Sequence, residues 1–253
     1  LVAELHRDDH KETQIAYRDT VRLGRRLAKM QPTSFQPVTF RSDASYLITG
    51  GLTGLGLLVV EWMAERGAVH IALMGRRAPS DEAVITLQRL QESGVHIEVV
   101  QGDVSVPDDV TRAIQTIAAP ETPLRGVMHA AGALDDGTLM LQNWQRFETV
   151  MKAKVDGTWN LHHLTHDLDF MVLFSSGASL LGSAGQGNHA AANAFMDGLA
   201  YYRQVRGLPT VSLNWGAWSG VGAAVDRNLD TQMDTISPAD GLHALERALR
   251  QGI

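Results

Sequence analysis

The stretch Thr49-Gly50-Gly51-Leu52-Thr53-Gly54-Leu55-Gly56 decides the fold of this chain. It directly follows the apolar run Tyr46-Leu47-Ile48, which is typical of a buried strand, and it opens a helix-length segment from Leu55 to Arg66. Glycines in such a turn let the backbone approach a pyrophosphate, whose charge is stabilised by unpaired N–H groups at the helix N-terminus. A glycine-rich loop alone is a weak signal. Placed between a strand and a helix, it predicts that these eight residues bind a dinucleotide.

The same alternation of strand and helix continues along the chain. We expect strands at residues 46–48, 69–74, 96–100, 124–129, 170–174 and 210–213. Helix-length segments cover residues 55–66, 81–92, 108–117, 144–164 and 188–203, and a last helix begins at Pro238 after the N-cap residue Ser237. This repetition predicts an α/β fold, a doubly wound parallel sheet of the Rossmann type with helices on both faces.

The composition of the 253 residues is that of a globular enzyme, with 44% hydrophobic and 20% charged residues. The chain has no cysteine, which excludes disulfides, zinc–cysteine sites and thiol catalysis. A net charge of −6 disfavours nucleic acid as a partner, and no apolar run approaches the roughly 18 residues of a membrane span. No signal peptide is recognisable. We therefore expect a soluble, cytoplasmic protein with neither nucleic acid nor membrane as a partner.

Residues 1–43 differ in composition from the rest of the chain. They are crowded with charges between Glu4 and Glu12 and are interrupted by Pro32 and Pro37. We interpret residues 1–43 as a linker and the tail of a neighbouring unit, and residues 44–253 as the nucleotide-binding domain. Because the chain starts at Leu1 and stops just beyond a helical pattern, we expect it to be cut from a longer polypeptide.

The end of the second expected strand indicates which dinucleotide is bound. An NAD-binding protein carries Asp or Glu there for the ribose hydroxyl, whereas this chain has Arg76 and Arg77, which suit the 2′-phosphate of NADP(H). A solvated basic turn is the alternative. At the end of the third expected strand, Asp103 and Val104 are placed to meet the adenine. At the end of the fourth, Ala130, Ala131 and Gly132 would form the floor of the ribose site. Each of these segments could also be a simple turn at a strand end.

Five motifs occur in a recognisable order. They are the glycine-rich loop, His129-Ala130-Ala131-Gly132, Phe174-Ser175-Ser176, Gly185-Gln186-Gly187-Asn188 and Asn214-Trp215-Gly216. Over residues 12–253 the chain thereby resembles the ketoreductase domains of modular polyketide synthases, which belong to the short-chain dehydrogenase/reductase superfamily. The resemblance implies the short-chain dehydrogenase type of Rossmann sheet, and it makes the segment from Gln14 to Arg18 the end of a structural subdomain.

The resemblance also implies an activity and partners. The family reduces β-ketoacyl groups to β-hydroxyacyl groups with NADPH, on a thioester that an acyl carrier protein presents among neighbouring synthase domains. Two alternatives stay open: a non-reducing NADP-binding scaffold in the same assembly, and a stand-alone reductase of small ketones or alcohols. The last is disfavoured by the start at Leu1 and by the expected subdomain remnant.

By the same resemblance, Lys154 is the catalytic lysine, Ser176 holds the substrate carbonyl and Asn193 completes the tetrad. Lys154 also anchors the ribose, and the backbone of Asn214, Trp215 and Gly216 meets the nicotinamide. Asn193 lies four residues after position 189, so a helix would place both side chains on one face.

Position 189 departs from the family, because His189 stands where the tyrosine acid is expected. Lys154 and an oxidised nicotinamide are both positive, so like charge disfavours the imidazolium. A neutral imidazole can still polarise a carbonyl by hydrogen bonding, as the neutral histidine of triosephosphate isomerase does, with the proton supplied through water. Two hypotheses follow: an active reductase that uses His189, and a domain that binds NADP and reduces slowly or not at all.

Three further features have alternative interpretations. Leu134-Asp135-Asp136 resembles the fingerprint of family members that yield the D-configured hydroxyl, with Gln186 nearby in the motif before His189, or it is a plain acidic loop. His162 and His166 form an i, i+4 pair, and His163 and His166 form an i, i+3 pair; such a pair can hold a metal. No third ligand for either pair is evident, so we expect a solvated helix face and no metal. Residues 220–235 are expected to form a lid or a surface loop.

Overall fold

The computed structural model describes residues 14–24, 26–29, 37–222 and 235–251. The chain divides into two compact units, Leu1–Gln36 and Pro37–Ile253. In the first unit, β1 (Ile15–Arg18) and β2 (Val21–Gly24) form an antiparallel hairpin. The boundary between the units lies before the predicted boundary at residues 43 and 44. The reason is that Phe40 is buried in the core of the second unit and the N–H of Val38 donates to Oε1 of Glu246 at 2.9 Å.

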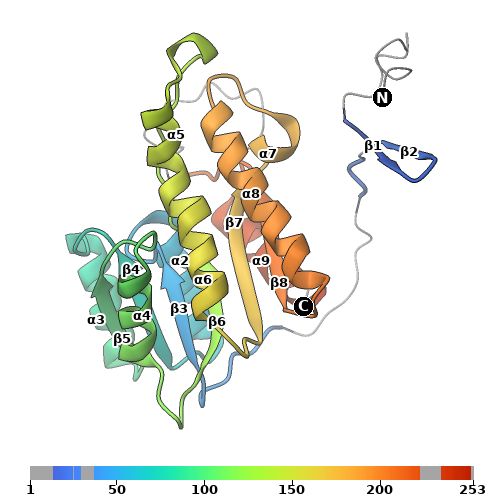
Figure 1. Ribbon diagram of the computed structural model, residues 1–253. Coiled ribbons are helices and arrows are strands. Elements are labelled where there is room, and N and C mark those ends of the chain that lie inside the picture. The colour runs from blue at the N-terminus through green and yellow to red at the C-terminus, as the bar shows by residue number, and fades with distance from the viewer. Residues whose placement is uncertain (1–13, 25, 30–36, 223–234, 252–253) are drawn as a thin grey trace. The chain divides into compact units, whose positions relative to one another are not determined.

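The second unit is built on six parallel strands in the order β5-β4-β3-β6-β7-β8 (Figure 1). Their bounds are Ser45–Thr49 (β3), His70–Gly75 (β4), His96–Gln101 (β5), Leu124–His129 (β6), Phe170–Ser176 (β7) and Thr210–Trp215 (β8). All six predicted strands are confirmed within two residues at each end, since long apolar runs specify strands that are covered on both faces. The order reverses direction between β3 and β6, which creates a crevice at the carboxyl ends of these strands.

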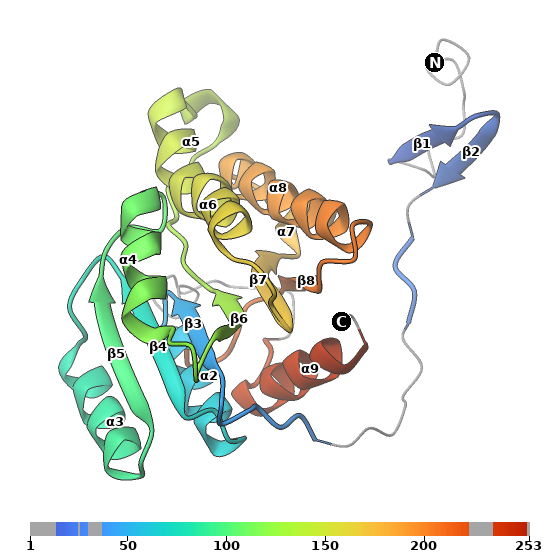
Figure 2. The same ribbon diagram turned by 60° about the horizontal axis from the view of Figure 1, so that its bottom comes forward.

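Helices cover both faces of this sheet (Figure 2). One layer contains α2 (Gly54–Glu65), α3 (Asp81–Glu92) and α9 (Pro238–Gln251), and the other contains α4 (Pro107–Ile117), α5 (Trp144–Met151), α6 (Gly157–Leu164) and α8 (Gly187–Gln204). Each layer encloses its own apolar core. The doubly wound Rossmann prediction is confirmed. The predicted start of α9 is also confirmed, because Ser237 Oγ accepts a hydrogen bond from the N–H of Asp240 at 3.1 Å.

The predicted helix at 144–164 is confirmed, but it is not α-helical throughout. It is divided into α5 and α6 by a π-helical turn at Lys152–Asp156, and two short helices, η1 (Leu139–Leu141) and α7 (Ala178–Leu181), were not predicted. Carbonyl groups of the π turn accept hydrogen bonds from side chains: Ala153 from Nε2 of His129, and Lys154 from the hydroxyl of Thr158. π turns occur often at functional sites, and this one carries Lys154.

Candidate active site

The glycine-rich loop is shaped for close backbone approach. Gly50 has a φ of +74°, and a Cβ there would lie 2.7 Å from the N atom of Ala131. A Cβ at Gly56 would overlap the carbonyl oxygen of Gly50. At the start of α2, Thr53 makes no side-chain cap and the first turn has no acidic residue. The loop therefore offers a backbone cradle and a helix N-terminus that suit a pyrophosphate.

A buried histidine connects this loop to the π turn. Nδ1 of His129 lies 2.5 Å from Oγ1 of Thr49, and Nε2 lies 3.1 Å from the carbonyl oxygen of Ala153. A carbonyl only accepts, so Nε2 donates to Ala153 and Nδ1 accepts from Thr49. Burial, reinforced by the charge of Lys154, lowers the pKa of His129 to about 3. His129 is therefore a neutral structural bridge between two parts of the site.

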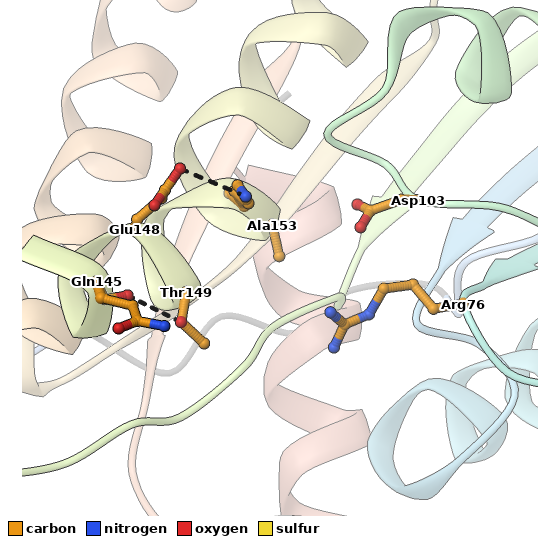
Figure 3. Close-up of a pocket in the computed structure, with 7 residues that line it drawn as sticks. Arg76, Asp103, Gln145, Glu148, Thr149 and Ala153 are labelled. Carbon is orange, nitrogen blue, oxygen red and sulfur yellow. Dashed lines mark hydrogen bonds and ion pairs between the residues drawn. The ribbon is translucent and has the colours of Figure 1, made fainter.

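Arg76 and Asp103 lie on one side of a cavity of about 260 Å³, and residues of the helix α5 lie on the other side (Figure 3). Arg77 is exposed and does not line this cavity. The carboxylate of Asp103 accepts from the N–H and the hydroxyl of Ser105, at 2.9 and 2.8 Å, so part of its hydrogen-bonding capacity is used by its own turn. The cavity is also lined by Gln145, Glu148, Thr149, Lys152 and Ala153.

The remaining nucleotide residues predicted at strand ends are near the same crevice. The N–H of Ala130 donates to the carbonyl of Thr49 at 2.9 Å, and a Cβ at Gly132 would lie 3.2 Å from Cε of Lys154. Leu52 and Val104 have buried side chains that belong to the two cores, so only their backbones are open to a ligand. Trp215 packs edge-on against Trp218 at 5.0 Å, and Gly216 approaches Ile236.

Lys154 is buried between the sheet and α8. Its Nζ donates to the carbonyl oxygen of Phe174 at 2.9 Å and lies 3.8 Å from Sδ of Met196. Burial lowers the pKa of Lys154 to about 8, and the negative charge of Asp197 opposes this shift. The ammonium is thus held two residues from Ser176 along β7 and can lose its proton at moderately alkaline pH.

The other predicted tetrad residues lie around the same end of β7. Ser176 is the last residue of β7, and its Oγ accepts from the N–H of Ala178 at 3.2 Å. His189 lies in the first turn of α8, one turn before Asn193, whose Nδ2 donates to the carbonyl of His189 at 2.8 Å. Oδ1 of Asn193 is buried and accepts no hydrogen bond from the described residues.

Asp197 belongs to this site and was not predicted. Its carboxylate accepts from Oγ of Ser179 and Oγ of Ser212, both at 2.6 Å, and from Nδ2 of Asn214 at 2.8 Å. The side chain of Asn214 therefore points into this network. The spacing of residues 189, 193 and 197 along one helix is the signal that could have identified Asp197.

The loop after β6 is fastened to the start of α8. Nε2 of Gln186 donates to Oδ2 of Asp136 at 2.9 Å, and Nδ2 of Asn188 donates to the carbonyl of Asp135 at 2.7 Å. Asp135 also pairs with Arg146 at 2.8 Å. Leu134 precedes these residues in the same loop. The structure thus brings three of the four predicted stereocontrol residues next to the turn that carries His189.

Two other predicted features are only partly described. Residues 223–234 of the expected lid lie outside the described residues, while the N–H of Ser219 donates to the carbonyl of Ile236 at 2.9 Å. Gly222 packs against Leu55: a Cβ at Gly222 would lie 3.4 Å from Cγ of Leu55.

Nδ1 of His162 accepts from Nη1 of Arg203 at 2.8 Å. None of the described helices is long and apolar enough to cross a membrane.

Comparisons with known proteins identify the family. The family model of the KR domain matches residues 44–220. The chain is 42% identical, over 85% of its length, to a mycocerosic acid synthase-like polyketide synthase of Mycobacterium tuberculosis (strain ATCC 25618 / H37Rv). It is 37% identical, over 90% of its length, to a phthioceranic/hydroxyphthioceranic acid synthase of Mycobacterium bovis (strain BCG / Pasteur 1173P2). The chain belongs to the ketoreductase domains of modular polyketide synthases, within the short-chain dehydrogenase/reductase superfamily.

Solved structures give the same family. An A-type ketoreductase from a modular polyketide synthase superimposes with a TM-score of 0.89 at 34% identity, and an A1-type ketoreductase with 0.90 at 33%. They cover 96% and 97% of this chain. The chain spans 53% and 54% of those two chains, but only 10% and 11% of the two synthases.

Proposed function

We propose that this chain reduces the β-keto group of a carrier-bound acyl thioester to a D-configured β-hydroxyl group, with NADPH as the reductant. The observation that carries the proposal is the convergence of Lys154, Ser176, His189 and Asn193 at the end of β7, beside the glycine-rich loop. Family membership supports the reaction class, and the whole synthase, its carrier protein and its neighbouring domains are proposed as partners by the same resemblance.

The residues of the crevice fit NADPH. The backbone of Gly50 and Gly51 and the N-terminus of α2 would hold the pyrophosphate, and Arg76 would hold the 2′-phosphate. Asp103 would face the adenine, and the ammonium of Lys154 would hold the ribose hydroxyls. When bound, NADPH supplies the hydride that reaches the keto carbon.

Ser176 and His189 would hold the keto oxygen. The Oγ of Ser176 donates one hydrogen bond to it, and the imidazole of His189 donates the other, in the place of the family's tyrosine. As negative charge develops on that oxygen, both hydrogen bonds strengthen. The proton comes from His189 or through water. If the imidazolium is the acid, turnover falls as the pH rises through the pKa of His189.

A second candidate function rests on the same position. A domain that binds NADP(H) without reducing the substrate keeps the cradle and Lys154 but lacks the tyrosine proton donor. We favour turnover, because the rest of the tetrad and the phosphate site are intact.

The proposed D-configuration rests on Leu134-Asp135-Asp136. Gln186 holds the carboxylate of Asp136 beside the start of α8, where it would form one wall of the acyl route and take no part in proton transfer. Chiral analysis of the product tests this assignment, and an L-alcohol would overturn it. We further propose that residues 1–43 comprise the end of a structural subdomain and a linker, of which residues 37–43 belong to the second compact unit. We also propose that the protein is cytoplasmic.

The deciding experiment measures NADPH oxidation with a β-ketoacyl thioester between about pH 6 and 9, a range that brackets histidine titration. The wild-type chain is expected to turn over, and His189→Phe to lose at least about tenfold in kcat. Calorimetric titration with NADPH is run on the same samples. The non-reducing alternative would be established if the wild type binds NADPH but shows no turnover, and if His189→Tyr restores turnover.

A further inference from the structure

Asp197 is the point where three elements of the site are joined. It lies on α8, and its carboxylate accepts from Ser179 just after β7 and from Ser212 and Asn214 on β8. Both carboxylate oxygens are used: Oδ1 by Ser212, and Oδ2 by Ser179 and Asn214. A carboxylate with this many short hydrogen bonds has one fixed orientation.

Two of these donors also hold the backbone of Ser176. The carbonyl oxygen of Ser176 lies 2.9 Å from Oγ of Ser179 and 3.3 Å from Nδ2 of Asn214. The single hydroxyl proton of Ser179 is therefore shared between this carbonyl and the shorter contact to Asp197. Ser212 makes no such contact with Ser176 among the described residues. Asp197 thus orients two side chains that also contact the backbone of Ser176, whereas Ser212 contacts Asp197 alone of these two residues.

The negative charge of Asp197 also acts on the ammonium of Lys154. Among the described residues, His129 on β6, which is neutral, and Asp197 on α8 interact electrostatically with Lys154. His189, on the same helix as Asp197, is the other titratable group of the site. With Lys154 buried, the negative charge of Asp197 favours the ammonium form. Without that charge, nothing among these groups opposes the effect of burial, which lowers the pKa of Lys154.

We propose that Asp197 is a positioning residue of this site, which holds Ser179 and Asn214 against the backbone of Ser176 and stabilises the Lys154 ammonium by its negative charge. The inference rests on the proposed function for the roles of Ser176 and Lys154. A residue that acts on both would couple the geometry of the substrate oxygen site to the charge of the cofactor site.

The charge is tested without turnover. The chain contains only four lysines, Lys11, Lys29, Lys152 and Lys154, so isotope labelling of lysine gives four side-chain NMR signals. Lys154→Arg identifies the signal of Lys154 by its loss. In Asp197→Asn, we expect the Lys154 titration to move about one pH unit lower. Asp81→Asn, which removes an exposed charge on α3, is the matched control and should leave it unchanged, as should Asp197→Glu.

A Lys154 titration that is the same in Asp197→Asn as in the wild type would overturn the electrostatic half of the proposal. If Asp197→Asn does not fold, Lys154 is titrated in Asp197→Glu and Asp197→Ser, and equal titrations in these two folded variants have the same meaning. Because the readout needs no reduction, it is independent of whether His189 supports turnover.

The positioning half is tested with two serines that each donate one 2.6 Å hydrogen bond to Asp197. Ser179→Ala also removes a contact to Ser176, and Ser212→Ala does not. We expect kcat to fall about tenfold in Ser179→Ala and less than about twofold in Ser212→Ala, with similar losses in the free energy of unfolding. Should the wild type be inactive, the His189→Tyr chain serves as the parent. Equal losses of kcat would mean that Asp197 is merely structural.

Discussion

Oγ1 of Thr49 lies 2.5 Å from Nδ1 of His129, and this hydrogen bond joins the glycine-rich loop to the strand that leads into the ribose site. The other ring nitrogen of His129 reaches the π turn next to Lys154. One neutral imidazole therefore fixes the distance between the proposed phosphate site and the lysine that we propose to be catalytic. Both contacts are buried, so a missing partner is not replaced by water without cost.

Thr49→Val tests this bridge. The substitution keeps the shape of the side chain but removes the hydroxyl donor, leaving Nδ1 of His129 as a buried acceptor. We expect the free energy of unfolding to fall by about 1–3 kcal/mol. Thr49→Ser retains the hydroxyl and is the matched control, for which we expect a smaller loss. Urea denaturation measures both, and equal losses in the two variants would contradict the assigned hydrogen bond.

His129 also predicts a pH dependence of stability. In the folded protein its pKa is about 3, whereas in the unfolded chain it titrates near 6.5. The unfolded state therefore binds more protons as the pH falls below about 6.5, and folding becomes less favourable. From about pH 7 to pH 5, His129 alone accounts for a loss of about 2 kcal/mol. Urea unfolding of His129→Gln at both pH values should show a correspondingly smaller decrease, and an unchanged decrease would refute the assignment.

Gly50→Ala tests the cradle. The new Cβ would meet the backbone of Ala131 and the residue would keep a positive φ, so the loop must move. We expect a loss of stability of at least about 1–2 kcal/mol and loss of NADPH binding. Gly198→Ala adds the same methyl group on α8, where nothing lies within 4 Å, and should stabilise the protein by about 0.5–1 kcal/mol. Thermal unfolding and NADPH titration distinguish the two; NADPH affinity retained in Gly50→Ala would count against this cofactor site.

Arg76→Gln tests which dinucleotide is preferred. Loss of a charge-assisted contact to the 2′-phosphate should weaken NADPH binding about 30-fold, while NADH binding stays within about twofold. Arg77→Gln is the matched control, because Arg77 lies outside the cavity that Arg76 lines, and it should change neither affinity much. Calorimetric titration with both cofactors measures the ratio. Parallel losses for NADPH and NADH would mean that Arg76 does not read the phosphate.

The sheet could be predicted from the sequence because its strands are buried on both faces. β3, for instance, is buried at all five positions, so its residues form an uninterrupted apolar run apart from Ser45 and Thr49 at its ends. The glycine-rich loop could also be predicted, because glycine is the favoured residue where φ is positive or where another backbone segment approaches closely.

The π turn could not be predicted, because Lys152–Asp156 has the same apolar spacing as an ordinary helix. Its extra width depends on tertiary contacts, among them that of His129 with Ala153. Asp197 was missed for a related reason: an acidic residue on a helix resembles a solvated side chain until the donors that follow β7 and lie on β8 are placed around it. The short hairpin β1–β2 lay in a charged segment without an apolar pattern of its own.

The tie between the loop after β6 and the start of α8 has a consequence for engineering. The N–H of Gly137 donates to the carbonyl of Gly185 at 2.8 Å, beside the bonds from Gln186 and Asn188 to Asp136 and Asp135. A graft of residues 134–138 from another ketoreductase that lacks an acidic residue at position 136 would lose the Gln186 bond, and a graft with a different backbone path would also lose the two bonds to backbone atoms of the loop. The smallest transplantable cassette therefore comprises both segments, 134–138 and 185–189, exchanged together.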